Sequence, residues 1–125
     1  MTALTPQALL WVALGGAIGS VLRFSVSVVA AGLLGPNYPW GTLLVNIIGS
    51  ALIGVAVGVE LSGTARLLLV TGMLGGFTTF SAFSAETLLL WERGWWQAAL
   101  YVGLSVGLGL AACAIAWVAT RSALH

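Results

Sequence analysis

Charged residues are scarce in this chain. Of 125 residues, four are arginine and three are glutamate, and there is no lysine and no aspartate. A soluble domain devotes about a quarter of its residues to charged side chains, which keep its surface wetted. Because 60% of this sequence is hydrophobic, we expect its solvent to be largely hydrocarbon. A net charge of +1 also leaves no basic footprint for nucleic acid.

Cysteine and histidine are nearly absent, with one of each, Cys113 and His125. A single cysteine excludes an intrachain disulfide and a metal site built from several cysteines. Residues 1–7 contain no basic residue, so the positively charged start of a secretory signal is missing. The apolar run that follows is also too long for a signal core, and we interpret it as a retained helix.

The apolar sequence divides into four stretches, and each is long enough to cross a bilayer, which takes about 20 residues. Thr5 and Pro6 predict a helix start, and glycine-containing turns separate the later stretches. Tryptophan and tyrosine gather near the expected ends, as in the aromatic belts of membrane proteins. The sequence predicts one all-α integral membrane domain over residues 1–125, with helices at about 6–31, 40–59, 64–91 and 95–120.

The third stretch has weak helix formers at its middle, Gly75-Gly76-Phe77-Thr78-Thr79. An unbroken helix over 64–91 would be about 42 Å long, against a hydrocarbon core of about 30 Å. We expect a break near Gly75–Thr79, and a continuous helix with a packing notch is the alternative. Irregular backbone at membrane depth must lie within protein or line a cavity, where freed carbonyls can hold cations.

Small residues recur four apart in every stretch, which places each pair on one helix face and favours close helix packing. We interpret four pairs in this way: Gly15 and Gly19, Gly54 and Gly58, Gly72 and Gly76, and Gly103 and Gly107.

The arginines give almost no preferred orientation in the membrane. Arg66 and Arg121 lie on the side of the membrane that holds both termini. Arg93 lies on the opposite side, and Arg23 lies in the half of the first helix that is nearer to that opposite side. Basic residues in short loops set orientation, so a chain without bias should insert both ways and supply two inverted copies. A single fixed topology is the alternative. Four short helices leave little interior for a pathway, which also favours a dimer.

Polar side chains within the apolar stretches follow helical spacing. Thr42, Asn46 and Ser50 form one stripe, and Tyr101 and Ser105 form a second. Interhelical hydrogen bonding explains a single hydroxyl, but a carboxamide cannot satisfy all its groups on its own helix, which favours a pathway role for Asn46.

Aromatic rings accompany these hydroxyls in the third stretch, where Phe80 and Phe83 share one helix face and alternate with Thr79, Ser81 and Ser84. Ring edges carry the positive end of the aromatic quadrupole and can face an anion. Uncharged donors hold an anion weakly enough for it to leave, as conduction requires. The pattern therefore indicates a path for a small anion without identifying the ion.

Three segments together resemble the Fluc family of fluoride channels, also called CrcB-like proteins. The segments are Gly15–Phe24, Gly41–Gly49 and Gly75–Ser84. Ser20 and Phe24 depart from the residues usual in the family, alanine and tyrosine, without touching the expected pore. The resemblance implies a passive, fluoride-selective channel rather than an enzyme. It would lie in the bacterial inner membrane as an antiparallel, dual-topology homodimer with two pores.

The resemblance also implies roles for individual residues. The fluoride pore would be lined by Phe80, Phe83, Asn46, Thr42, Ser81, Thr79, Tyr101 and Ser105. Arg23 would lie near the aqueous vestibule. The carbonyls of Gly75 and Thr78 would hold a structural sodium ion at the dimer interface. Glu86 matches a family glutamate, and we expect it to be structural or near a mouth of the pore.

Two other functions fit a small helical membrane protein. A dual-topology, proton-coupled multidrug transporter would need a buried carboxylate at a central site, and Glu86 is the sole candidate within the predicted spans. A membrane scaffold would leave the Asn46 stripe and the phenylalanine pair without a shared purpose. We expect the channel, with fluoride, sodium, a second copy and the lipid bilayer as its partners.

Overall fold

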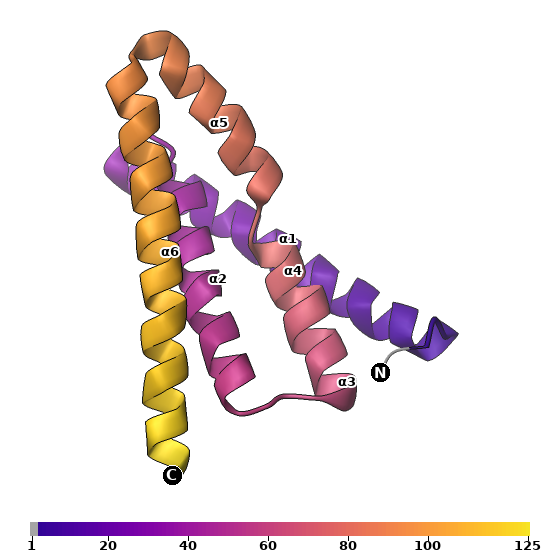
Figure 1. The fold of residues 1–125 in the computed structure, drawn as a ribbon. Coiled ribbons are helices and arrows are strands. Elements are labelled where there is room, and N and C mark those ends of the chain that lie inside the picture. The colour runs from indigo at the N-terminus through magenta and orange to yellow at the C-terminus, as the bar shows by residue number, and fades with distance from the viewer. Residues whose placement is uncertain (1–2) are drawn as a thin grey trace.

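The computed structural model describes residues 3–125 and consists of helices joined by short links (Figure 1). The first two crossings are α1 (Pro6–Leu34) and α2 (Trp40–Gly58), and the last is α6 (Trp95–Leu124). The third crossing, Gly63–Arg93, is made of α3 (Gly63–Arg66), the π-helix η1 (Leu67–Leu74), α4 (Gly75–Phe77) and α5 (Phe80–Arg93). Four helices are thus long and apolar enough to span a membrane, and the predicted all-α fold is confirmed.

Helix ends differ from those predicted by a few residues. The first helix continues past Ala31 to Leu34 and stops where Gly35 adopts a φ of 91°, a conformation that favours glycine. Gly32 did not stop it, because a glycine inside a helix costs only about 1 kcal/mol. The last two helices likewise extend to Arg93 and Leu124, so that Gly94 alone separates α5 from α6.

The start of α1 follows the predicted capping. The Thr5 hydroxyl accepts a hydrogen bond of 3.1 Å from the amide of Ala8, and Pro6 occupies the first turn. An N-cap of this kind satisfies one of the amides that the first helical turn leaves unpaired.

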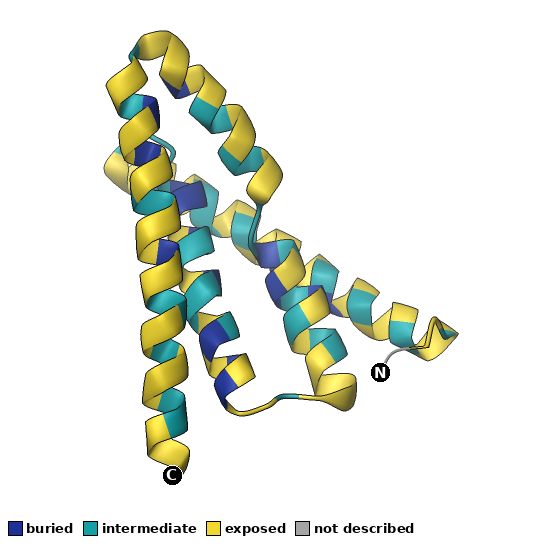
Figure 2. Ribbon diagram, viewed as in Figure 1, coloured by how far each residue is buried: buried dark blue, intermediate teal, exposed yellow. Residues whose placement is uncertain are grey.

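The helices pack as two pairs (Figure 1). Helix α6 lies along α2, while α1 crosses η1 and α4. Beyond the break, α5 leans toward α6 and packs against its first part, where the chain reverses at the α5–α6 turn. The buried core is correspondingly thin and centres on Leu43, Leu90, Ala98 and Tyr101. Most outward-facing side chains are exposed and apolar (Figure 2), as a hydrocarbon solvent allows.

Glycines set the closest helix contacts. A Cβ on Gly15 or Gly19 would overlap the backbone of the third crossing, at Leu68 and Met73, and a Cβ on Gly54 would overlap Cys113. The packing interpretation holds for these glycines. Gly103 and Gly107 are different, because a Cβ built there would meet nothing within 4 Å in the described chain apart from the adjoining backbone of α6 itself.

Replacing Gly19 with alanine should destabilise the protein by about 1–3 kcal/mol, because the added methyl meets backbone that cannot move aside. Gly32→Ala is the matched control, since open space surrounds that position in the same helix. Thermal unfolding of the purified protein, followed by helical circular dichroism, compares the two. Equal melting temperatures would show that the α1 contact is not close-packed.

Candidate functional site

The third crossing is broken at two threonines. Thr78 has φ −84° and ψ 157°, and Thr79 has φ −151° and ψ 116°, so both are extended. The predicted break is confirmed, and the continuous helix is wrong. Gly75 and Gly76 stay helical. The threonine hydroxyls close the two helix ends, because Thr78 donates to the Leu74 carbonyl at 2.9 Å and Thr79 accepts from the Ala82 amide at 3.1 Å.

Asn46 replaces the helical hydrogen bonds that the break removes. Its Nδ2 donates to the Thr79 carbonyl at 3.1 Å, and its Oδ1 accepts from the Thr79 amide at 2.8 Å. Both backbone groups of Thr79 are thereby satisfied at membrane depth, where water cannot serve. The carboxamide retains one N–H for another acceptor, and its predicted pore role stays a prediction.

Arg23 donates a hydrogen bond to the helix end that precedes the break. Its Nε donates to the Gly76 carbonyl at 3.0 Å, an oxygen that would accept from residue 80 in a continuous helix. The guanidinium therefore lies against the end of α4, within the protein. The vestibule role expected for Arg23 stays a prediction.

The carbonyl oxygens of Gly75 and Thr78 also lose their helical donors at the break. In a continuous helix the Gly75 carbonyl would accept from Thr79 and the Thr78 carbonyl from Ala82. Those amides bond instead to the Asn46 and Thr79 side chains. Gly75 and Thr78 also line a cavity of about 280 Å³ beside Asn46. Backbone carbonyls at unwound helices are the oxygens that hold sodium in membrane proteins, so the donor set fits the expected ion.

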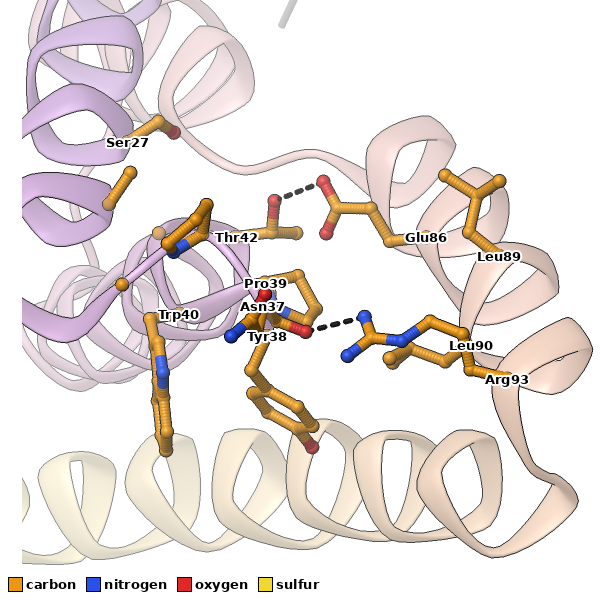
Figure 3. Close-up of a pocket in the computed structure, with 14 residues that line it drawn as sticks. Ser27, Asn37, Tyr38, Pro39, Trp40, Thr42, Glu86, Leu89, Leu90 and Arg93 are labelled. Atoms are coloured by element: carbon orange, nitrogen blue, oxygen red, sulfur yellow. Dashed lines mark hydrogen bonds between the residues drawn. The ribbon is translucent and has the colours of Figure 1, made fainter.

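Glu86 joins three helices at the centre of the site. Its Oε1 accepts from the Thr42 hydroxyl at 2.8 Å, and its Oε2 accepts from the Tyr101 hydroxyl at 3.0 Å. Figure 3 shows the first of these bonds. Sequence reasoning placed Glu86 only as structural or near a mouth and missed both partners. An acid inside an apolar helix is the signal that points to them.

Aromatic rings continue from this carboxylate. The Tyr101 ring lies 5.3 Å from that of Phe83, which lies 5.6 Å from that of Phe80. Tyr101 is fully buried, whereas Phe80 is 79% exposed. The row therefore runs from the core of one protomer to its surface. Thr79 and Ser81 lie at the start of the same helix, with their hydroxyl oxygens 3.3 Å apart.

Two buried hydroxyls beside Tyr101 have no hydrogen-bond partner among residues 3–125. They belong to Ser105, four positions after Tyr101 on α6, and to Tyr38. The Tyr38 ring meets the Tyr101 ring edge-on at 5.7 Å. Sequence reasoning assigned Tyr38 to the aromatic belt and missed this contact. Because buried polar groups are normally paired, each of these unpaired hydroxyls indicates a ligand or ordered water beside it.

The site opens at the α1–α2 turn. A cavity of about 320 Å³ there is lined by Tyr38, Thr42, Glu86 and Arg93, among others (Figure 3). Arg93 donates to the Asn37 carbonyl across this opening. Burial raises the pKa of the Tyr38 hydroxyl, which keeps it a neutral donor. Glu86 also lines this cavity, and its expected place near a mouth of the pore stays a prediction.

The structure thus brings the predicted residues into three adjoining groups. Thr42, Tyr101, Phe83 and Phe80 follow one track with Glu86. Ser105 extends this track along α6. The second group surrounds the break and consists of Asn46, Thr79, Ser81 and Arg23. The third group lines the small cavity and consists of Gly75 and Thr78.

Asn46→Ala should destabilise the protein by about 1–3 kcal/mol, because it leaves the amide and carbonyl of Thr79 without partners. Ser50→Ala, one turn further along the same stripe, is the control, since the Ser50 side chain makes no hydrogen bond within residues 3–125. Chemical unfolding in detergent measures the difference. If Asn46→Ala unfolds at the same midpoint as Ser50→Ala, the break does not depend on this side chain.

The chain is similar to known proteins over most of its length. A family model described as "CrcB-like protein, Camphor Resistance (CrcB)" matches residues 10–117. A relative from Rhizobium etli, named fluoride-specific ion channel FluC, is 55% identical over 107 residues, covering 81% of this chain and 86% of the relative. A relative of the same name from Rhizobium johnstonii is 52% identical over 124 residues, covering 94% and 98%. A third, from Roseiflexus sp., is 54% identical over 106 residues, covering 80% and 86%.

Proposed function

Because this chain belongs to the CrcB-like protein family, we propose that it is a passive, fluoride-selective channel. The family resemblance in its sequence is confirmed, and the chain is a multi-pass membrane protein. The relatives named as fluoride-specific channels support the choice of ion.

One structural observation carries the proposal. A track of hydroxyls and ring edges runs through an otherwise apolar protein, from Thr42 and Tyr101 past Phe83 to Phe80. The unpaired hydroxyl of Ser105 lies along the same helix as Tyr101. The Thr42 and Tyr101 hydroxyls donate to Glu86, so the donors left for an anion are the unpaired hydroxyls of Ser105 and Tyr38 beside the track. Such neutral O–H donors can replace the water shell of a compact anion without holding it as a fixed cation would. The edges of the phenylalanine rings carry the positive end of the aromatic quadrupole, so they can face the anion where hydroxyl donors are few.

The channel assembles as an antiparallel homodimer with two pores. Phe80 ends its track at the protomer surface, so a second copy is needed to enclose the path. Gly103 and Gly107 present an uncovered small-residue face on α6, of the kind that allows close helix approach. The almost unbiased arginine distribution supplies copies in both orientations.

A sodium ion lies at the interface of this dimer and is structural. The carbonyls of Gly75 and Thr78 would hold it, because both lost their helical donors at the break. In a dimer, the two protomers would together offer four such oxygens. The positive charge would join the two broken helices, and it takes no part in the movement of fluoride.

The physiological direction is export across the bacterial inner membrane. Hydrogen fluoride crosses membranes as a neutral acid and dissociates inside the cell, where the pH is higher. The trapped anion then leaves down its own gradient through the channel, which relieves toxicity. No coupled ion has to move, so no titrating group is required.

The transporter alternative is weaker on the same geometry. A proton-coupled transporter requires a carboxylate that binds either a proton or the substrate. Both oxygens of Glu86 already accept hydrogen bonds, from Thr42 and Tyr101. The relatives named as ion channels also favour the channel.

Phe80→Ile should lower fluoride efflux from proteoliposomes by about tenfold or more, because it removes a ring edge from the path. Phe24→Ile is the matched control, since Phe24 is also an exposed phenylalanine but lies on α1, away from the track. A fluoride electrode measures the flux, and the protein must remain dimeric on size exclusion.

The same vesicles test the proposal as a whole. Chloride efflux from wild-type vesicles should be undetectable beside fluoride efflux. If the sodium ion is structural, vesicles made with protein that was purified in N-methylglucamine instead of sodium should lose their fluoride flux. Wild-type vesicles that retain fluoride, or that release chloride equally fast, would refute the channel. Normal fluoride flux in Phe80→Ile would remove that ring from the pore.

The two orientations can be counted with a single cysteine. In a Cys113→Ser background, Ser122→Cys places a thiol in the exposed last turn of α6. A membrane-impermeant maleimide should label about half of it in intact cells, because the arginines give no orientation bias. Permeabilised cells give the full signal for reference. Complete labelling, or none, in intact cells would exclude the antiparallel dimer.

A further inference from the structure

Three of the four arginines bond to another residue of the described chain. Arg23 donates to the Gly76 carbonyl, Arg93 to the Asn37 carbonyl, and Arg121 to Glu60 at 3.3 Å. The exposed guanidinium of Arg66 makes no hydrogen bond or ion pair within residues 3–125. Its N–H groups are therefore available to an anion from outside the protein.

Arg66 lies on the rim of a cavity that the proposed pore does not use. The cavity, of about 670 Å³, separates the first turns of α1 from α3 and the start of η1. Figure 1 shows these segments near each other on the side away from the α5–α6 turn. Its volume falls within the range of about 300–1,000 Å³ typical of small-molecule sites.

The lining is mostly polar at the starts of α1 and α3 and mixed further along the helices, where Trp11, Leu67 and Thr71 contribute. The rim carries Arg66 together with the hydroxyls and amide of Thr5, Gln7, Ser62 and Thr64. Trp11 lies four residues, or about 6 Å, beyond Gln7 along α1, and it lines the cavity together with Ala8 and Leu67. Tryptophan prefers the depth of lipid headgroups, so the cavity spans the boundary between headgroups and acyl chains.

We propose that this cavity binds the headgroup of an anionic phospholipid, with its phosphate on Arg66 and the start of its acyl chains against Trp11 and Leu67. Arginine pairs with phosphate oxygens through two parallel N–H bonds. The rim hydroxyls can donate to the remaining oxygens; Thr5 can donate because its oxygen accepts from Ala8. In an antiparallel dimer the two copies would place one such site in each leaflet.

The inference is independent of fluoride conduction and is tested by binding. The purified dimer is mixed with phosphatidylglycerol and phosphatidylcholine of identical acyl chains, and retained lipid is counted by native mass spectrometry. Wild type should retain phosphatidylglycerol preferentially. Arg66→Gln should lower that retention by about five- to tenfold, the loss expected for one charged contact to a lipid.

Arg121→Gln is the matched control, because it removes the same charge on the same side of the membrane from a residue already paired with Glu60. It should leave retention unchanged. An equal loss in both variants would mean a general surface-charge effect and would overturn the proposal. So would equal retention of both lipids by wild type, or displacement of the lipid by millimolar inorganic phosphate, which would indicate a site for the free ion.

A second measurement follows the lipid without altering Arg66. Phosphatidylglycerol brominated near the headgroup should quench tryptophan emission, and Trp11→Phe should remove more of that quenching than Trp117→Phe. Both tryptophans lie toward the side with the two termini, but only Trp11 lines the cavity. Equal effects of the two substitutions would place the lipid elsewhere. Neither readout uses flux, so a failed channel assay would leave this result intact.

Discussion

The pairing of Asn46 with the Thr79 backbone is the interaction on which the rest of the site depends. A helix broken at membrane depth exposes amides and carbonyls that lipid cannot satisfy. The carboxamide on α2 supplies both a donor and an acceptor to one residue, and Arg23 supplies a donor to the preceding helix end. The break is therefore stable only because three crossings meet around it.

Several features follow from that arrangement. Because the Asn46 and Thr79 side chains occupy two amides, the carbonyls of Gly75 and Thr78 are left available for a cation. Because α5 starts afresh at Phe80, it can tilt away from α4 and bring Phe83 and Glu86 against α6. The polar track and the expected cation position are thus two consequences of one break.

The site also shows how polar groups are accommodated in a thin core. Glu86 has its two oxygens hydrogen-bonded by Thr42 and Tyr101, which offsets part of the cost of holding a carboxylate among apolar helices. The hydroxyls of Ser105 and Tyr38 remain without partners in the described chain. Both hydroxyls can therefore donate to an anion or to water. The sequence pattern indicated a polar role for Ser105 but gave no such indication for Tyr38.

The sequence by itself determined the four crossings and the start of α1 at Thr5 and Pro6, because composition and local helix propensity act through neighbouring residues. It marked the middle of the third crossing as weakly helical, but the choice between a break and a packing notch was made by the contacts of Asn46 and Arg23. It also predicted the stripes that supply Asn46, Thr42 and Tyr101. Only the tertiary structure decided that Asn46 bonds Thr79, that Glu86 receives both Thr42 and Tyr101, and that Tyr38 reaches the same place. Those contacts join residues far apart in the chain, and their geometry depends on how α2, α5 and α6 pack, which helical spacing does not encode.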